Sequence, residues 1–306
     1  MELAWITVEK IIEMFIIIAV GAVIFKLGII DRDANKKMSG LLLKVVAPAM
    51  ILMSYQMEFR MELLQGLMMT GLLSLVTSLI AIVLSSVLIR RGHPNEEVER
   101  MAVVYSNCGF IGIPLIQGLL GTEGVFFMTA YLTVFNMLIW SHGLMLMCGV
   151  SSIGTVLKNL VQPATVAIIL GLLFFVLHIE IPEVAANPLS FIGNMNTPLA
   201  MLVAGGNLAD SNLVAALKRP RTYRISFLKL IAIPLAALAA LVLAGAGQSV
   251  SLTVLVAVSC PTGAMGTMFA MQYGKDSNYA AELFAVTTIL SMITMPVVIL
   301  VGGGFL

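Results

Sequence analysis

The chain has 306 residues, of which 59% are hydrophobic and 11% charged, and its mean hydropathy is +1.03. Charged residues make up about a quarter of an ordinary soluble domain, so this composition excludes a soluble globular protein and indicates an integral membrane protein. Seventeen Lys and Arg against sixteen Asp and Glu exclude nucleic acid as a partner, because binding to phosphates needs a basic surplus on one face.

The chain divides into apolar segments separated by polar breaks. A hydrocarbon core about 30 Å thick needs about 20 apolar helical residues per crossing. The ten predicted spans cover roughly residues 6–27, 38–57, 63–89, 100–119, 124–148, 162–179, 187–209, 222–246, 250–273 and 278–304. The N-terminus lacks the basic region of a cleaved signal peptide, so the first span is expected to be retained. We therefore predict an all-α, polytopic protein of the cell membrane.

The basic residues are sorted between the two sets of connections. Thirteen of the seventeen Lys and Arg lie in the connections that follow odd-numbered spans, and two, Lys10 and Arg60, lie on the opposite side. Cytoplasmic loops collect Lys and Arg. This pattern predicts that the odd-numbered loops are cytoplasmic and that both termini lie outside.

Two pairs of segments suggest an internal repeat. Proline follows a polar residue by four places in Lys44-x-x-x-Pro48 and again in Asn194-x-x-x-Pro198. The fourth and ninth spans each carry G-x-x-G, starting at Gly109 and Gly263, then a further glycine and an acid. Five spans per half, an odd number, make the two halves inverted. We predict repeats at residues 1–148 and 162–306, joined by a short cytoplasmic linker at 149–161.

Glycine and proline recur in the fourth and ninth spans, in Ser106-Asn107-Cys108-Gly109 and Ser259-Cys260-Pro261-Thr262. Proline removes a backbone donor and glycine adds backbone freedom, so both spans are expected to open midway. A simple kink is the alternative for either span alone. Interrupted spans at repeat-related positions are a transporter signature, and opened backbone at that depth lines a protected cavity.

Few ionisable residues lie inside the predicted spans. Glu13 is expected to pair with Lys10 or to reach the interface. Lys44 either reaches the cytoplasmic interface or turns inward to an anion, and His142 either carries a proton or makes a packing hydrogen bond. Lys229 and Glu282 are interpreted as boundary residues at span ends. Cys108, Cys148 and Cys260 form no C-x-x-C pair and are interpreted as packing residues.

The pattern of polar groups favours a small anion as substrate. The spans hold no aspartate pair for cation–proton exchange, and the chain has no Walker A motif for ATP. We expect no enzymatic activity, no cofactor and no bound metal, because the sequence offers no nucleophile–base pair or metal cluster. Half-helix N-termini present free N–H groups to carboxylate oxygens, and Asn107 adds a side-chain donor.

The stretch from Asn107 to Leu115, followed by Gly121, resembles the auxin efflux carrier family, as do Lys44-x-x-x-Pro48 and Cys260-Pro261-x-Gly263. This family includes plant auxin exporters and bacterial malate or malonate permeases. The resemblance covers essentially the whole chain, and Asn-x4-Gly-Ile-Pro-Leu is its most specific part. The short linker is similar to bacterial members. Thr262 stands where plant exporters have a larger amide, which puts auxin itself in doubt.

The resemblance implies a ten-helix inverted repeat similar to sodium/proton antiporters and bile-acid symporters. Spans 1, 2, 6 and 7 would form a scaffold, and spans 3–5 and 8–10 a transport unit that slides like an elevator, with the broken spans crossing near Pro114 and Pro261. The predicted substrate site comprises Ser106, Asn107, Cys108, Gly109, Pro114, Ser259, Cys260, Pro261, Thr262, Gly263, Lys44, Pro48, Asn194 and Pro198.

The sequence thus predicts a secondary transporter of a small organic anion, a mono- or dicarboxylate such as malate or malonate, with His142 as a candidate for proton coupling. A sodium- or proton-coupled ion carrier of the same fold is the main alternative, and a membrane enzyme or receptor is a remote third. The small and apolar residues of the scaffold spans also permit a homodimer in the lipid bilayer.

Overall fold

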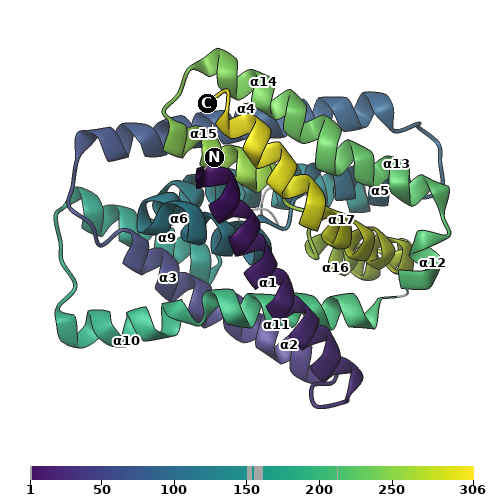
Figure 1. Cartoon of the computed structure of the whole chain (residues 1–306), viewed down its shortest axis with the longest axis horizontal. Helices are drawn as coiled ribbons and strands as arrows, with labels where there is room; N and C mark the ends of the chain where they lie inside the picture. The colour runs from purple at the N-terminus through teal and green to yellow at the C-terminus, as the bar shows by residue number, and fades with distance from the viewer. Residues whose placement is uncertain (1, 150–153, 155–160, 212) are drawn as a thin grey trace.

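The computed structural model describes residues 2–149, 154, 161–211 and 213–306, and apart from one isolated β-bridge their regular structure is helical (Figure 1). The predicted linker at 149–161 lies largely outside the described residues. The helices of the first half are α1 (Glu2–Lys26), α2 (Arg32–Leu41), η1 (Leu42–Val46), α3 (Ala47–Ser54), α4 (Met61–Leu88), α5 (Glu96–Val104), η2 (Cys108–Gly112), α6 (Ile113–Leu138), η3 (Ile139–Gly143) and α7 (Leu144–Cys148). Those of the second half are α9 (Pro163–Val176), α10 (Glu183–Asn194), α11 (Asn196–Asp210), α12 (Leu213–Leu217), α13 (Pro220–Phe227), η4 (Leu228–Ala232), α14 (Ile233–Ala244), α15 (Gln248–Ser259), α16 (Met265–Gln272) and α17 (Ser277–Gly303).

Five helical stretches of the described chain are long and apolar enough to cross a membrane. They are 32–54, 61–88, 108–148, 220–244 and 277–303. α9 and α15 are apolar but shorter, and the predicted seventh span is divided at Met195 between α10 and α11. The multi-pass, all-helical architecture is therefore confirmed. The count of ten spans and the five-plus-five repeat stay predictions.

Three π-helical turns stand just before prolines. η1 ends two residues before Pro48, η2 two residues before Pro114 and η4 two residues before Pro234. Proline lacks the N–H that would close the next α-helical bond and its ring crowds the preceding turn, so the helix widens there instead. Each of these three prolines thus marks a local change of helical register, and two of the turns, η1 and η4, carry a lysine.

The corresponding glycines after the two broken spans share one conformation. Gly121 has φ +62° and Gly274 has φ +67°, in the left-handed region that glycine occupies without steric cost. Each ends a half-helix and turns the chain toward the next span. This agreement fits the repeat that their spacing predicted.

α1 packs against α11, and the two backbones come very close at Gly21 and Gly205. A Cβ built on Gly205 would lie 2.1 Å from the carbonyl oxygen of Ile18, and one on Gly21 would lie 2.4 Å from that of Leu202. Only glycine allows this approach, because the opposing atoms are main chain and cannot rotate away. The two helices therefore form one tightly packed pair.

Gly205→Ala is expected to destabilise the protein by at least about 1–3 kcal/mol, because the added methyl group overpacks this contact. The measurement is the melting temperature in detergent micelles. Gly40→Ala on α2 is the matched control, since a Cβ there meets no atom within 4 Å, and it should not lower the melting temperature. Equal melting temperatures for the two variants would contradict the close packing of α1 on α11.

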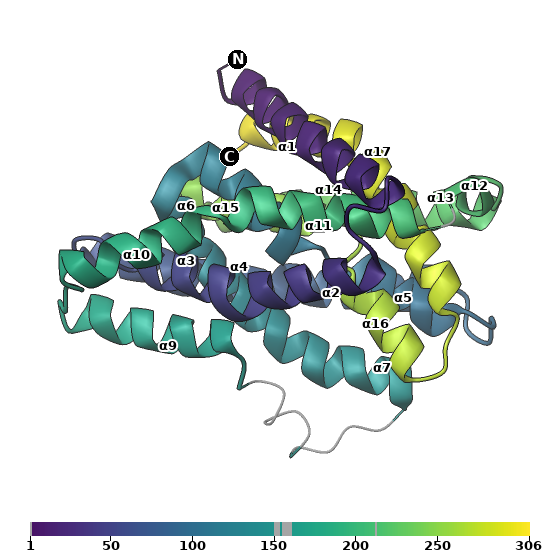
Figure 2. The same cartoon turned by 90° about the horizontal axis from the view of Figure 1, so that it is seen from below.

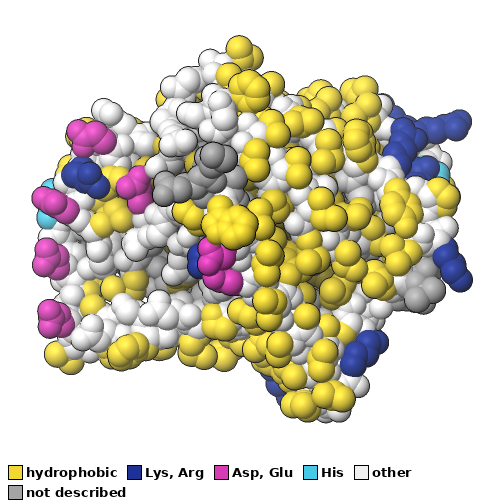
Figure 3. Space-filling view, viewed as in Figure 1, with side chains coloured by type: hydrophobic (Ala, Val, Ile, Leu, Met, Phe, Trp, Pro, Cys, Tyr) yellow, Lys and Arg dark blue, Asp and Glu magenta, His cyan; other side chains and the backbone are white. Residues whose placement is uncertain are grey.

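Charge is distributed unevenly along the long axis of the molecule. On the face shown in Figure 3, Lys and Arg gather at one end, most Asp and Glu lie toward the other, and hydrophobic side chains fill the band between. The sorting counted along the sequence is thus visible in three dimensions. α1 and α17 pack against each other, and the two ends of the chain lie on the same side of the molecule (Figure 1 and Figure 2).

Candidate functional site

The fourth and ninth predicted spans both open midway, as expected, and they cross at their openings. α5 ends at Val104, and α15 ends at Ser259. Ser106 and Thr262 form an isolated antiparallel bridge between the two extended segments. Asn107 donates its N–H to the carbonyl of Pro261 at 2.7 Å, and Gly263 donates to the carbonyl of Tyr105 at 2.9 Å. The backbone groups freed by the two breaks thus bind each other.

Side chains strengthen this crossing. The Thr262 hydroxyl donates to the carbonyl of Ala102 at 3.0 Å and so caps the end of α5, while the Thr262 N–H donates to the Thr287 hydroxyl on α17 at 3.1 Å. A Cβ on Gly263 would come within 3.2 Å of the Ser106 carbonyl oxygen, so the small residue lets the two segments meet. Ser106 and Thr262 are both buried.

The crossing lies at Ser106, not at Pro114 as the sequence predicted. Pro114 lies inside the continuous helical stretch 108–148, where the π-helical turn η2 accommodates its missing N–H. The break occurs eight residues earlier because Ser106 and Asn107 leave the helical conformation and pair across to the ninth span. Pro261, by contrast, lies in the opening itself, as predicted.

A half-helix begins beside Asn107 and faces open space. The first turn of a helix carries N–H groups without intrahelical partners and the positive end of the helix dipole. η2 starts at Cys108, and a Cβ built on Gly109 would meet no atom within 4 Å. The Asn107 side chain is 6% exposed. The structure therefore offers backbone donors and one amide to a ligand at this end of the crossing.

Lys229 is a functional residue that the sequence interpretation misplaced. It was assigned to a span boundary, but it lies on η4 in the middle of the 220–244 helix and is 0% exposed. Its ammonium donates to the Ser106 hydroxyl at 2.5 Å and to the Val258 carbonyl at 3.4 Å. Among the described residues it forms no salt bridge. The crossing therefore contains a buried lysine without a carboxylate.

A signal for Lys229 was present in the sequence. Lys44 precedes Pro48 by four residues, and Lys229 precedes Pro234 by five. The sequence interpretation places Lys229 near the end of the eighth span and therefore treats it as a boundary residue. Distance along the sequence is a poor guide to depth here, because α13 begins at Pro220 and carries the chain inward.

The residues predicted from the second and seventh spans lie on α3, η1, α10 and α11, of which α11 packs against η2. Lys44 is exposed and lines a surface pocket of about 500 Å³ with Lys36 and Lys37. Asn194 is exposed, whereas Asn196, two residues on, is 1% exposed and neither atom of its amide has a partner. We correct the choice of Asn194 in favour of Asn196, because an unpaired buried amide is available to a ligand or to water.

The remaining predicted side chains have structural contacts. His142 Nδ1 lies 2.9 Å from the Tyr105 hydroxyl. This contact confirms the packing hydrogen bond that was one of the two predicted roles of His142, and the other role, proton coupling, stays a prediction. Cys108 and Cys260 are buried as packing residues, but Cys148 is exposed, so for it that interpretation was wrong. The Lys10–Glu13 pair forms at 2.9 Å, as expected.

A buried charge cluster joins α5, α13 and α17 and was not predicted. Glu99 on α5 is 0% exposed and accepts hydrogen bonds from the Arg221 guanidinium and, at 3.0 Å, from the Tyr279 hydroxyl. Glu282, also taken for a boundary residue, is 4% exposed and pairs with Arg219 at 3.3 Å. These contacts join α5, α13 and α17 into one body.

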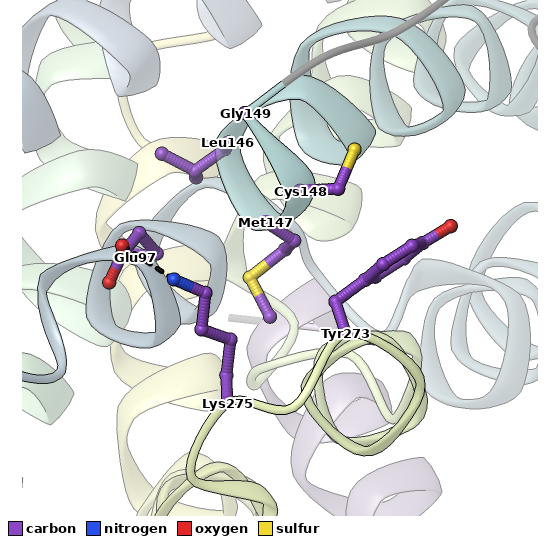
Figure 4. A pocket seen from close by; sticks show the side chains of 7 residues that line it. All are labelled: Glu97, Leu146, Met147, Cys148, Gly149, Tyr273 and Lys275. Atoms are coloured by element: carbon purple, nitrogen blue, oxygen red, sulfur yellow. Dashed lines mark hydrogen bonds and ion pairs between the residues drawn. The ribbon is translucent and has the colours of Figure 1, made fainter.

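A separate pocket of about 400 Å³ lies at the end of α7 (Figure 4). Lys275 crosses it to bind Glu97 at 2.8 Å, and Cys148 and Tyr273 line its other side. None of the residues that line it was predicted to bind substrate. The pocket therefore does not enlarge the candidate site at the crossing.

The family model that matches this sequence does so twice, once in each half of the chain. The sequence matches the Mem_trans family, described as membrane transport protein, over residues 6–153 and 150–299. A protein of Methanothermobacter thermautotrophicus, described as an uncharacterized transporter, is 23% identical in an alignment of 304 positions. The alignment covers 94% of this chain and 96% of that protein.

Proposed function

Because the chain belongs to the Mem_trans family of membrane transport proteins, the auxin efflux carrier family, we propose that it is a secondary transporter of a small organic anion. The substrate class is a mono- or dicarboxylate such as malate or malonate. The observation that carries the proposal is the opened crossing, where a half-helix starts at Cys108 with open space at Gly109, and where the largely buried Asn107 lies next to Ser106, the partner of the buried Lys229.

Helix dipoles make this crossing selective for negative charge. α5 and α15 end there, so their carbonyl groups bring about half a negative charge each, and η2 and α16 begin there with about half a positive charge each. Lys229 lies against the carbonyl ends through Val258. The Lys229 charge offsets the negative C-terminal ends of α5 and α15. The positive N-terminal ends of η2 and α16 are then available to bind a carboxylate.

The pattern of ion pairs supports elevator-like sliding of two units. Arg32 pairs with Asp210 between α2 and α11, inside the proposed scaffold. Arg221 with Glu99 and Lys275 with Glu97 pair inside the proposed transport unit. Among the described residues no salt bridge joins the two units. Relative movement would therefore break contacts that are mostly between neutral groups.

The orientation follows from the charge distribution. We place the basic end of the molecule in the cytoplasm and both termini outside, because Lys and Arg concentrate in cytoplasmic loops. This placement puts the Glu99–Arg221 cluster near the cytoplasmic surface and the crossing deeper in the bilayer.

In proteoliposomes loaded with unlabelled carboxylate, the wild-type protein is expected to accumulate the labelled compound by counterflow. A panel of mono- and dicarboxylates, including malate and malonate, identifies the substrate, and empty liposomes give the background. Accumulation of none of these anions, with protein shown to be folded by its melting curve, would overturn the proposed substrate class.

The same assay separates this proposal from a sodium-coupled carrier. Discontinuous helices in sodium-coupled carriers use carbonyl ends to coordinate the ion, and here the Lys229 ammonium lies against one such end. Replacement of sodium by choline on both sides is therefore expected to leave counterflow unchanged. A loss of counterflow in choline would favour sodium coupling.

A further inference from the structure

Three buried hydroxyls on the elements around Lys229 have no hydrogen-bond partner among the described residues. They belong to Thr222 and Ser226 on α13 and to Ser259 at the end of α15, and their exposed fractions are 0%, 1% and 1%. Buried polar groups are nearly always bound to protein or to ordered water. In the interior of a membrane protein such groups mark places where water enters.

Other buried hydroxyls of this chain behave differently. Thr70, Ser74, Thr77 and Thr253 each donate to the carbonyl four residues earlier, which satisfies the hydroxyl inside its own helix. Thr222 and Ser226 do not make this bond. Their hydroxyls are therefore free to bind water where α13 packs against its neighbours.

The unpaired hydroxyls of α13 lie on the same face as Lys229. Residues 222, 226 and 229 follow the i, i+4, i+7 spacing of one helical face. Arg221, which binds Glu99, directly precedes Thr222 and so lies at the same end of α13 but on an adjoining face, and Lys229 stands at the inner end of the row against Ser106. The row therefore runs from the level of the Glu99–Arg221 cluster to the ammonium at the crossing.

Few other charges surround Lys229. Five elements pack against η4, and of these α14 and α15 carry no ionisable side chain. The ionisable residues on the other three elements, together with the two neighbouring thiols, are Glu96, Glu97, Glu99 and Arg100 on α5, Arg221, Tyr223 and Arg224 on α13, Tyr279 and Glu282 on α17, and Cys108 and Cys260. Glu99 and Glu282 are already paired with arginines, so the buried ammonium has no fixed counter-ion.

We propose that Lys229 is the proton-carrying residue of this transporter, and that Thr222 and Ser226 line its water path to the Glu99–Arg221 cluster. The proposal rests on the proposed transport function and adds its coupling ion. Lysine is suited to this role, because burial without a counter-ion allows it to exchange its proton, which arginine cannot do.

The exchange is a simple proton transfer. The ammonium gives one proton to a water molecule in the row and becomes a neutral amine, and the reverse transfer restores the charge. The charged form carries the carboxylate across the membrane, and the neutral form carries the empty site back. One proton thus moves with each anion, and no oxidant or reductant is involved.

Two assays on Lys229→Arg test the proton step. Counterflow exchanges anion for anion and needs no net proton movement, so the counterflow rate of each variant is the reference for its own uptake. The ratio of uptake driven by a pH gradient to counterflow should fall at least about tenfold in Lys229→Arg, because arginine stays charged. Lys26→Gln, at an exposed lysine, is the control and should change neither rate. An undiminished ratio in Lys229→Arg would overturn the proposal.

The water path is tested by removing its hydroxyls. Thr222→Val and Ser226→Ala should slow gradient-driven uptake at least about tenfold when combined and leave counterflow unchanged. Thr77→Val is the matched control, because its hydroxyl is buried but bound inside α4. Equal uptake by the double variant and the control would exclude this path.

A third measurement needs no substrate and covers the case in which Lys229→Arg does not fold. The melting temperatures of wild type and Lys229→Gln are followed in detergent between about pH 6 and 10. A proton-exchanging lysine makes their difference depend on pH, whereas parallel curves would contradict proton exchange by Lys229. If the difference depends on pH but no carboxylate gives counterflow, the proton site stands and the proposed substrate class fails.

Discussion

Arg221→Met is expected to destabilise the protein by about 3–5 kcal/mol, the largest loss of stability foreseen here, because it leaves the Glu99 carboxylate buried and without its cation. Glu99 is fully buried and takes two of its hydrogen bonds from Arg221. The Tyr279 hydroxyl alone cannot neutralise its charge. The melting temperature in detergent micelles measures the effect.

Two further variants show whether the unpaired charge is the cause. Glu99→Gln combined with Arg221→Met should recover most of the loss, because the remaining amide is neutral. Arg32→Met is the matched control: Arg32 is 80% exposed in its pair with Asp210, so the change should cost no more than about 1 kcal/mol. Similar losses of stability for Arg221→Met and Arg32→Met would show that the burial of Glu99 does not determine how much its pair with Arg221 contributes.

Asn107→Asp is expected to weaken binding of the carboxylate about a thousandfold, the largest functional effect. A negative charge about 4 Å from the bound anion costs about 4 kcal/mol at an effective dielectric constant of about 20. Asn107→Ala removes only a donor to a charged group and should weaken binding about 10- to 100-fold. The half-saturating concentration in the counterflow assay gives both values.

Which of the two variants binds carboxylate more weakly shows where the anion lies. If the anion lies beside the half-helix at Cys108, aspartate must be worse than alanine at position 107. Asn187→Asp, an exposed position on α10, controls for a general effect of added charge and should leave binding unchanged. Equal effects of aspartate and alanine would place the anion elsewhere in the protein.

The breaks in the fourth and ninth spans could be predicted because glycine and proline act locally. Asn107, Pro261 and Thr262 were found in this way, and the structure brings them together at one crossing. The exact position was harder, since Pro114 fits the start of a helix as well as a break. Pairing with the other half of the chain moved the break to Ser106.

Lys229 and Glu99 could not be placed from local pattern, because their burial depends on partners far away in sequence. Glu99 lies beside a polar connection, yet α5 begins at Glu96 and takes it inward to meet Arg221. Asn196 was passed over for a similar reason. The four-residue spacing pointed to Asn194, whereas the division between α10 and α11 decides which asparagine is buried.

The backbone bonds at the crossing also bear on how the protein is made. The carbonyl of Tyr105 and the N–H of Asn107 find their partners only at Gly263 and Pro261, in the other half of the chain. Until that half is synthesised, the broken fourth span must hold unpaired peptide groups at bilayer depth, where each costs several kcal/mol. The first half is therefore an incomplete insertion product. Its fourth span reaches its final depth only after the ninth span has been synthesised and inserted. The folding of the first half is therefore completed by the second half.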